Sequence, residues 1–331
     1  MHRTVGPSIT RRTALAAGAC LFGGPALAQP VCKLGLPNHV KGPAVWQDLH
    51  QDELDASYNQ EFYQPHTDAI NSRLSGLSYE LRTRLGYPER VDYGEGPDEA
   101  MDIYKAPESG GPVFVFVHGG IWLYLDASYA GFAAEMFLDR GANFVSLDFA
   151  PVNELEGDLA RQADQVRRGI AWVVRNAKSF GGDPARVYIG GHSSGGHLAA
   201  VALTTDWAGE FGLPTDAVKG GLCMSGMYDL EPVRLSWRSR YIAFTDAMED
   251  ATSPQRHLDR ITAPVVVSYG TLETPEFQRQ AKDFAAALEA AGKPVQLIVG
   301  QNYFHQDMWE TLGNPYGPNG RAALAMMDLG P

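Results

Sequence analysis

The chain has 331 residues and a formal net charge of −12, with 44% hydrophobic and 20% charged residues. This composition is typical of a globular protein with a substantial core, and it excludes a disordered, collagen-like or disulfide-dense chain. An acidic surface repels nucleic acid and anionic lipid, so we expect neither as a partner.

The first 28 residues predict a secretory signal peptide that is not part of the fold. Arg11 and Arg12 precede an uncharged run, residues 14–28, that ends in the A-x-A cleavage pattern. The run is too short to span a bilayer, and the arginine pair favours twin-arginine export to the periplasm or out of the cell. An uncleaved tail is the alternative. No later segment is long and apolar enough to span a membrane, so we expect no membrane span after cleavage.

Residues 29–86 predict an N-terminal arm that packs on the domain formed by residues 87–331. Strands are expected at 90–93 and 101–105, on either side of a Gly/Pro turn. The unbroken apolar run at 113–117 is typical of a parallel strand that is covered on both faces.

Strands and helices alternate from this point, which predicts an α/β fold with a mostly parallel, eight-stranded sheet flanked by helices. Residues 225–260 form a long connection that carries aromatic residues between arginines, and we expect a helical lid there, over the carboxyl ends of the strands. The helices are expected at 129–140, 158–180, 195–205, 276–291 and 320–327, and the strands at 143–148, 187–189, 219–224, 264–269 and 295–299, the last as the final core strand.

Two glycine-rich turns, residues 118–122 and 191–197, each follow an expected buried strand and together predict a serine hydrolase. The second fits G-x-S-x-G, the strand-to-helix elbow that lifts a serine hydroxyl clear of a sheet. Only Ser193 has glycines two positions before and after it, so it is the candidate nucleophile; a passive serine in a tight turn is the alternative. The first turn is similar to the HGG-type loop that binds an oxyanion. The expected oxyanion donors are the backbone N–H groups of Gly119, Gly120 and Ser194.

A serine hydroxyl needs an imidazole to accept its proton and a carboxylate to orient that imidazole. Hydrolases with this elbow have the chain order Ser, acid, His. His305 is the only histidine after the last expected core strand, so it is the candidate base, with a surface histidine as the alternative.

The acid is expected in the loop after strand 264–269, where Glu273 lies. Glu276 is a rival, although it falls in the first turn of a helix, where an acid also suits the helix dipole. Asp229 and Glu231, after the preceding strand, are further rivals.

Two cysteines, Cys32 and Cys223, remain after signal cleavage, and an oxidising compartment permits a bridge between them. The apolar surroundings of Cys223 favour a buried free thiol instead. No CxxC motif and no Cys/His zinc spacing is present, so no metal is expected.

The motifs extend into a wider similarity. The chain resembles the arylformamidase-like (kynurenine formamidase-like) branch of the α/β-hydrolases, which is close to the hormone-sensitive-lipase-like esterases. The resemblance implies an esterase or amidase for small acyl or aryl substrates, without a cofactor. The family often has Asp where Glu273 stands, and Asn-His-Phe where this chain has Phe304, His305 and Gln306. The similar stretches are residues 55–59, 101–104, 118–122, 191–198, 225–230, 274–280, and His305 with 310–316.

We therefore expect an exported serine carboxylesterase that cleaves small apolar or aromatic esters through an acyl-enzyme. One alternative is an arylformamidase or amidase that acts on N-acyl aromatic amines. The other is a non-catalytic binding protein on a hydrolase scaffold, which is disfavoured because the chain keeps both nucleophile and base. A small-molecule substrate is the one partner expected. The side chains expected to contact it are Trp122, Tyr124, His192, Trp237 and Tyr241, although each aromatic residue would equally suit the core.

Overall fold

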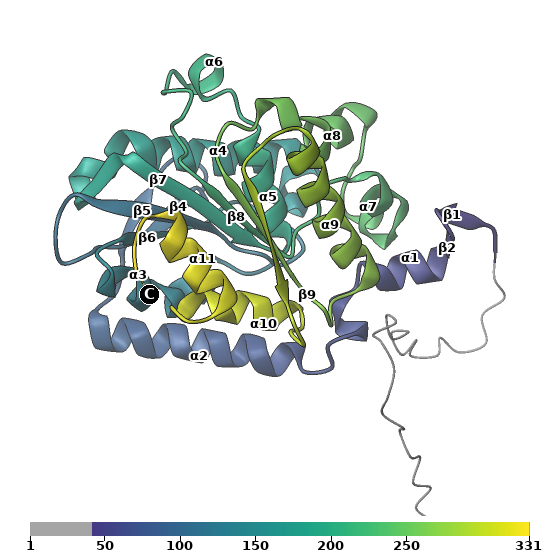
Figure 1. Ribbon diagram of the computed structural model, residues 1–331, viewed down its shortest axis with the longest axis horizontal. Coiled ribbons are helices and arrows are strands. Elements are labelled where there is room, and N and C mark those ends of the chain that lie inside the picture. The colour runs from purple at the N-terminus through teal and green to yellow at the C-terminus, as the bar shows by residue number, and fades with distance from the viewer. Residues whose placement is uncertain (1–41, 331) are drawn as a thin grey trace, which may run out of the picture. The chain divides into compact units, whose positions relative to one another are not determined.

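A computed structural model describes residues 42–330. The predicted signal peptide, the start of the arm and Cys32 lie outside the described residues. An eight-stranded sheet runs through the molecule in the order β10-β9-β8-β7-β5-β6-β4-β3, with helices on both faces (Figure 1). Its strands are β3 (Glu89–Asp92), β4 (Ala100–Tyr104), β5 (Gly111–Val117), β6 (Asn143–Leu147), β7 (Gly182–His192), β8 (Gly221–Met224), β9 (Val265–Gly270) and β10 (Val295–Gly300).

The predicted mostly parallel sheet is confirmed. All neighbouring strands from β10 to β6 pair in parallel, whereas β4 pairs antiparallel with both β6 and β3. The main helices are α2 (Thr67–Leu85), α3 (Ala134–Asp139), α4 (Leu159–Asn176), α5 (Ser194–Leu203), α9 (Pro275–Ala290), α10 (His305–Glu310) and α11 (Pro318–Met326).

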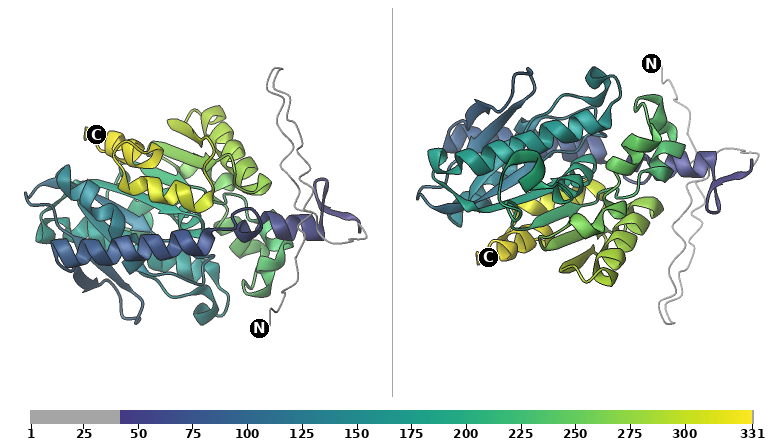
Figure 2. Two further views of the ribbon diagram at one scale, coloured as in Figure 1. Left: turned by 90° about the horizontal axis from the view of Figure 1, so that it is seen from below. Right: turned by 90° about the horizontal axis from the view of Figure 1, so that it is seen from above.

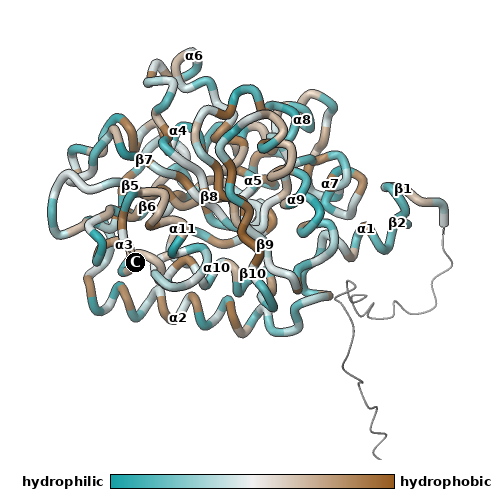
Figure 3. The backbone as a smooth tube through the Cα atoms, in the orientation of Figure 1, coloured by the Kyte–Doolittle hydropathy of each residue, from teal (hydrophilic) through white to brown (hydrophobic). Residues whose placement is uncertain are grey.

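Two hydrophobic cores lie on opposite faces of the sheet, because successive side chains of a strand point to opposite sides. Val113, Val115 and Val117 of β5 pack in the core that holds α4, α5 and α9. Phe114 and Phe116, which alternate with them, pack in the core that holds α3 and α11. Figure 3 shows hydrophobic central strands and more polar outer helices. The unbroken apolar run therefore reflects burial on both faces.

Some elements differ from the expected ones. The expected helix at 129–140 begins as a 3-10 helix (Ala127–Ala133) and becomes α-helical only in α3. The last strand, β10, pairs with β9 alone and leaves Leu297 and Val299 partly exposed, so it is an edge strand and not a core strand. The helix α10, which begins at His305, was not expected from the sequence.

The arm and the lid pack against each other. The described part of the arm starts with a two-stranded hairpin, β1 (Ala44–Trp46) and β2 (Leu49–His50), followed by α1 (Gln51–Ser57). The expected lid contains two short α-helices, α7 (Glu231–Leu235) and α8 (Asp246–Ala251), together with 3-10 turns. Figure 2 shows α1 beside the lid helices in both views.

The remaining helix, α6 (Trp207–Phe211), is short and lies in the connection between α5 and β8. Between residues 42 and 330, no helix has the length and apolar character needed to cross a membrane. Cys223, in β8, is buried as a free thiol.

Candidate active site

Ser193 lies in the sharp turn between β7, which ends at His192, and α5, which begins at Ser194. Its backbone has φ 58° and ψ −125°, a conformation that a non-glycine residue rarely adopts and that costs free energy. The flanking glycines make the turn possible. A Cβ atom on Gly191 would lie 2.2 Å from the carbonyl oxygen of Gly195, and one on Gly195 would lie 2.1 Å from that of Val117. Side chains at these two positions would therefore displace the elbow.

The loop after β5 lies directly against this turn. A Cβ atom on Gly119 would be 3.1 Å from Cβ of Ser193 and 2.9 Å from the carbonyl oxygen of His192. The loop is anchored to the elbow by the backbone N–H of Trp122, which donates to Oγ of Ser194 at 3.1 Å. Within the part of the chain that the structure describes, the N–H groups of Gly119 and Gly120 donate to no protein acceptor. They are therefore available to an oxygen atom bound beside Ser193.

His305 and Glu273 are in direct contact. Nδ1 of His305 lies 3.0 Å from Oε2 of Glu273, and the two residues are 3% and 1% exposed. The other carboxylate oxygen, Oε1, accepts from the hydroxyl of Ser225 at 2.6 Å and from the backbone N–H of Gly270 at 2.7 Å. Three donors thus hold one buried carboxylate, which compensates for its removal from water.

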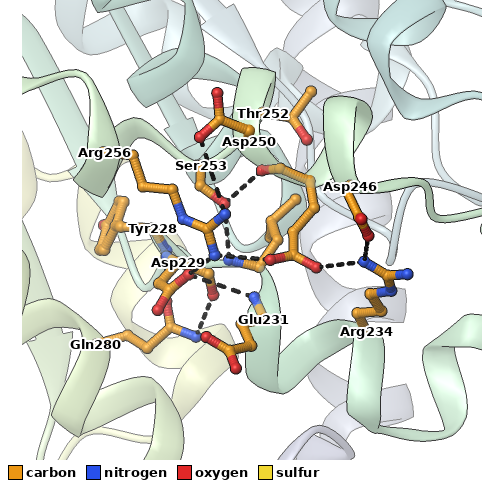
Figure 4. A network of polar contacts seen from close by, with 12 residues as sticks. Tyr228, Asp229, Glu231, Arg234, Asp246, Asp250, Thr252, Ser253, Arg256 and Gln280 are labelled. Atoms are coloured by element: carbon orange, nitrogen blue, oxygen red, sulfur yellow. Dashed lines mark hydrogen bonds and ion pairs between the residues drawn. The ribbon is translucent and has the colours of Figure 1, made fainter.

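The rival acids have other partners. Glu276 is buried but accepts from Arg279 and from the hydroxyl of Tyr58. Asp229 accepts from Arg256 at 3.0 Å in the network that Figure 4 shows. Glu231 is exposed at the start of α7. Among the four candidates, only Glu273 contacts His305.

Ser193 and His305 belong to the same region of the molecule, because His192, the residue before Ser193, places its ring 4.4 Å from the ring of His305. Neither the hydroxyl of Ser193 nor Nε2 of His305 is among the buried polar atoms that lack a partner in residues 42–330, and neither forms a protein hydrogen bond. Both atoms are therefore accessible to solvent. The two atoms form no hydrogen bond with each other in the described residues; catalytic hydrogen bonds are often long without substrate and shorten only in the reacting complex.

His192 forms a hydrogen bond with the backbone of His305. Its Nε2 lies 2.9 Å from the carbonyl oxygen of His305, so it carries the proton and donates. Its ring lies 4.4 Å from the ring of His305 and stacks on Trp309. Burial and the neighbouring His305 lower the pKa of His192 well below its ordinary value. His192 is thus a buried, neutral residue that fixes the backbone of His305, and its contact with substrate stays a prediction.

Trp122 also differs from its expected role. The indole is 1% exposed, and its Nε1 donates to Nδ1 of His197 at 3.2 Å. His197 in turn donates from Nε2 to the carbonyl oxygen of Thr252, at the end of α8, at 2.7 Å. Burial lowers the pKa of His197 to about 4. Trp122 is therefore a core residue that joins the glycine-rich loop after β5 (residues 118–122, the glycine loop) to the lid.

The other expected substrate contacts lie at the lid. Tyr124, just after the glycine loop, is 64% exposed. Trp237 and Tyr241 are half-buried, with ring centroids 5.6 Å apart. The lid itself is held by Glu249, which accepts from Arg234 at 2.9 Å and from Arg256 at 2.7 Å.

The arm makes contacts that sequence reasoning missed. The hydroxyl of Thr274, next to Glu273, donates to the carbonyl oxygen of Ser57 at 2.6 Å. The side chain of Gln64 accepts from the backbone N–H of Gln306, next to His305, at 3.1 Å. The arm therefore braces the loops of both the acid and the base. In the sequence, the one indication of this role is the similarity of residues 55–59 to the family.

The parallel sheet, the elbow at Ser193 and the histidine–carboxylate pair define an α/β-hydrolase. The BD-FAE family model matches residues 101–220. Kynurenine formamidase from Salmo salar is 30% identical over 81% of this chain and 93% of its own length. Isoprenylcysteine alpha-carbonyl methylesterase ICME from Arabidopsis thaliana is 27% identical over 66% of this chain and 56% of its own.

Among solved structures, esterase LipW from Mycobacterium marinum has a TM-score of 0.62 and 18% identity, covering 82% of this chain and 90% of that one. At this identity the likeness shows the fold alone. Together with the relatives, it confirms the resemblance expected from the motifs. The chain belongs to the arylformamidase-like branch of the α/β-hydrolases, and it is a hydrolase of the esterase and amidase type.

Proposed function

We propose that the protein is a serine carboxylesterase in which Ser193 is the nucleophile, His305 the general base and Glu273 the acid that orients it. The observation that carries this proposal is the 3.0 Å contact between Nδ1 of His305 and Oε2 of Glu273, beside the elbow. A carboxylate accepts only from a protonated nitrogen, so Nδ1 holds the ring proton and Nε2 keeps a free lone pair. That lone pair is free to accept the proton of the Ser193 hydroxyl.

The reaction follows from this tautomer. Ser193 attacks the carbonyl carbon, and the backbone N–H groups of Gly119, Gly120 and Ser194 stabilise the negative oxygen that forms. His305 then passes its proton to the leaving group, and water releases the acyl group by the same steps. The free N–H groups of the glycine loop support this assignment.

Small apolar or aromatic esters are the proposed substrates. The exposed ring of Tyr124 and the lid rings of Trp237 and Tyr241 support this choice, because aromatic walls favour flat apolar groups. The second candidate is cleavage of N-acyl aromatic amines, favoured by the kynurenine formamidase relatives. Comparing kcat/KM for a phenyl ester and the matching formanilide separates the two.

The cellular location is part of the proposal. Arg11, Arg12 and the run at 14–28 favour twin-arginine export to the periplasm or beyond. Fractionation of cells that express the full chain tests this, with replacement of both arginines by lysine as the comparison. Wild-type protein that stays with the cytoplasmic fraction would contradict export.

The nucleophile is tested with a fluorophosphonate probe, which labels activated serines, and with p-nitrophenyl acetate as the substrate. We expect Ser193→Ala to abolish labelling and to lower kcat about 10⁴-fold or more, because the covalent route is lost. Ser179→Ala, at an exposed serine in the 3-10 turn before β7, is the matched control. Turnover by Ser193→Ala at the wild-type rate would refute the assignment.

A further inference from the structure

A buried cation lies in the lid without an acidic partner. Arg238, in the 3-10 turn Trp237–Arg240, is 2% exposed. Within residues 42–330 no carboxylate lies within ion-pair distance of its guanidinium. The carboxylate of Asp55, on the adjoining arm, accepts instead from the backbone N–H of Trp237 at 2.7 Å and from Gln51. A buried charge is costly unless an opposite charge compensates for it.

All partners of Arg238 are neutral. The guanidinium lies 5.3 Å from the ring centroid of Trp122 and 5.4 Å from that of Trp237. Nη1 donates to the hydroxyl of Tyr241 at 3.0 Å, and Nη2 donates to the carbonyl oxygen of Tyr58 at 2.9 Å. Two ring faces and two neutral acceptors compensate only in part for a full charge, because each such contact is weaker than an ion pair with a carboxylate.

Two buried donors at this place lack an acceptor. Nε of Arg238 and Nε1 of Trp237 are both shielded from solvent and form no hydrogen bond. Both are N–H groups, and an arginine has no acceptor atom. What is missing at this position is therefore an acceptor, and the positive charge of the guanidinium favours a negative one.

This group of residues adjoins the proposed catalytic site. Trp122, under the guanidinium, is bonded through its backbone to Ser194. On the other side, the ring of Tyr58 packs on Phe277, whose ring meets that of His305 at 5.0 Å. Arg238 is thus separated from the elbow by Trp122 and from the base by Tyr58 and Phe277.

On the half-buried side of this group, the hydroxyl of Tyr241 accepts from Nη1 of Arg238 at 3.0 Å. Burial raises the pKa of Tyr241 above its ordinary value, Arg238 opposes the shift, and Tyr124 adds to it, so the two tyrosines are electrostatic neighbours. Tyr124 is largely exposed. An anion would reach the guanidinium by replacing the Tyr241 hydroxyl as the acceptor of Nη1.

We propose that Arg238 binds a carboxylate of the substrate, so that the preferred ester or amide carries an anionic group next to an aromatic or apolar body. This inference rests on the proposed function and deepens it. The aromatic rings around Arg238 would contact the flat part of such a molecule, and the guanidinium would form charge-assisted hydrogen bonds with its carboxylate. The chain as a whole carries a net charge of −12, which opposes anionic ligands at long range. A preference for an anionic substrate would therefore require a local cation.

Two matched substrate pairs test the proposal. One is 4-acetoxybenzoate and its methyl ester, with the carboxylate on the leaving group. The other is mono-4-nitrophenyl glutarate and its methyl ester, with the carboxylate on the acyl group. We expect the ratio of kcat/KM for the acid to that for the methyl ester, in at least one pair, to fall about tenfold or more in Arg238→Gln, mainly through KM. Arg238→Lys keeps the charge without the planar guanidinium, so it should retain part of the preference for the acid over its methyl ester.

The controls separate binding from a structural role. Arg240→Gln, at an exposed arginine two residues away, should leave the wild-type ratio unchanged. If Arg238→Gln slows the acid and the methyl ester equally in both pairs, the residue only holds the lid and the proposal is wrong. If wild-type protein cleaves neither member of either pair, the proposed function itself fails.

A measurement on wild-type protein covers the case in which the variant does not fold. With methyl 4-acetoxybenzoate as the substrate, 4-hydroxybenzoate should inhibit at least about tenfold more tightly than 4-hydroxybenzamide, or glutarate more tightly than glutaramate. Equal or weaker inhibition by both acids would overturn the proposal.

Discussion

Ser193 and Glu273 follow strands of the same sheet, but they are held in different ways. Ser193 is positioned by its own backbone, in a turn where Gly191 and Gly195 allow chain segments to meet at distances that exclude a side chain. Glu273 is positioned by side chains and by distant segments. It accepts from Ser225, which is 48 residues away, and its neighbour Thr274 is bonded to Ser57.

This difference determines how each region responds to substitution. The elbow tolerates few substitutions at its glycines, because any Cβ atom there displaces the strand or the helix. The acid loop depends on a set of polar bonds that substitutions can remove one by one. We therefore expect loss of function at the elbow to be abrupt and loss at the acid loop to be graded. Ser193→Ala tests the elbow, and the three predictions below test the acid loop and the helix after the elbow, from the largest expected effect to the smallest.

Removing the charge of the acid should have the largest effect. We expect Glu273→Gln to lower kcat about 10⁴-fold for p-nitrophenyl acetate, because the amide no longer holds His305 in the productive tautomer. Glu273→Asp should fall between this variant and wild type, since its carboxylate is one methylene farther from Nδ1. Glu276→Gln is the matched comparison, and a larger loss of kcat there than in Glu273→Gln would mean that the acid has been misassigned.

Removing a hydrogen bond to Glu273 should have an intermediate effect on kcat. Ser225→Ala deletes the hydroxyl that donates to Oε1 of Glu273 at 2.6 Å. A hydrogen bond to a charged group contributes about 1.5–3 kcal/mol, so kcat should fall about tenfold or more while the free energy of unfolding also decreases. Both Ser and Ala carry a Cβ atom at the φ of 51° found here, so the exchange isolates the hydroxyl.

Ser268→Ala is the control for this second prediction. Ser268 is equally buried, but its hydroxyl has no partner among residues 42–330. Its substitution should leave kcat close to the wild-type value. If the two variants lose equal activity, the bond between Ser225 and Glu273 does not support the acid, and the graded response fails.

The smallest effect concerns His197, in the helix that follows the elbow. His197 links Trp122 to Thr252 and has a pKa of about 4 in the folded protein, against about 6.5 in an unfolded chain. As the pH falls from 6.5 towards 4, the unfolded chain takes up a proton that the folded protein does not, so stability decreases. At pH 5 this linkage costs about 2 kcal/mol relative to pH 7.

Urea unfolding at pH 7 and pH 5 measures that linkage. In His197→Phe the loss of stability between the two values should be smaller than in wild type by about 2 kcal/mol. His66→Gln, at an exposed histidine, should retain the wild-type difference. An unchanged difference in His197→Phe would show that His197 does not couple pH to stability.

The features that could be predicted from the sequence are those with a local cause. The run at 113–117 predicted a strand because it is covered on both faces, and the glycines around Ser193 predicted the elbow because the turn needs them. The edge position of β10 could not be predicted. Its residues 295–299 are as apolar as a core strand, and only the pairing order shows that one side is open.

The side-chain partners within the site had no local signal. Nothing near Ser225 indicates that its hydroxyl meets a glutamate 48 residues later. Trp122 and His192 are next to functional residues in sequence, which suggested substrate contact, but their side chains point into the core. Arg238 lies within the expected lid, but its burial could not be predicted. That burial depends on residues from three separate segments of the chain.

The bonds between the arm and the two loops also limit the order in which the molecule can be assembled. Ser57 and Thr274 are 217 residues apart, and Gln64 and Gln306 are 242 apart. A ribosome releases the arm first, yet neither bond can form until most of the chain has been synthesised. Contacts between such distant segments form slowly because long loops must close first. These two bonds therefore form late, and the acid and base loops gain the support of the arm only after the last part of the chain has folded.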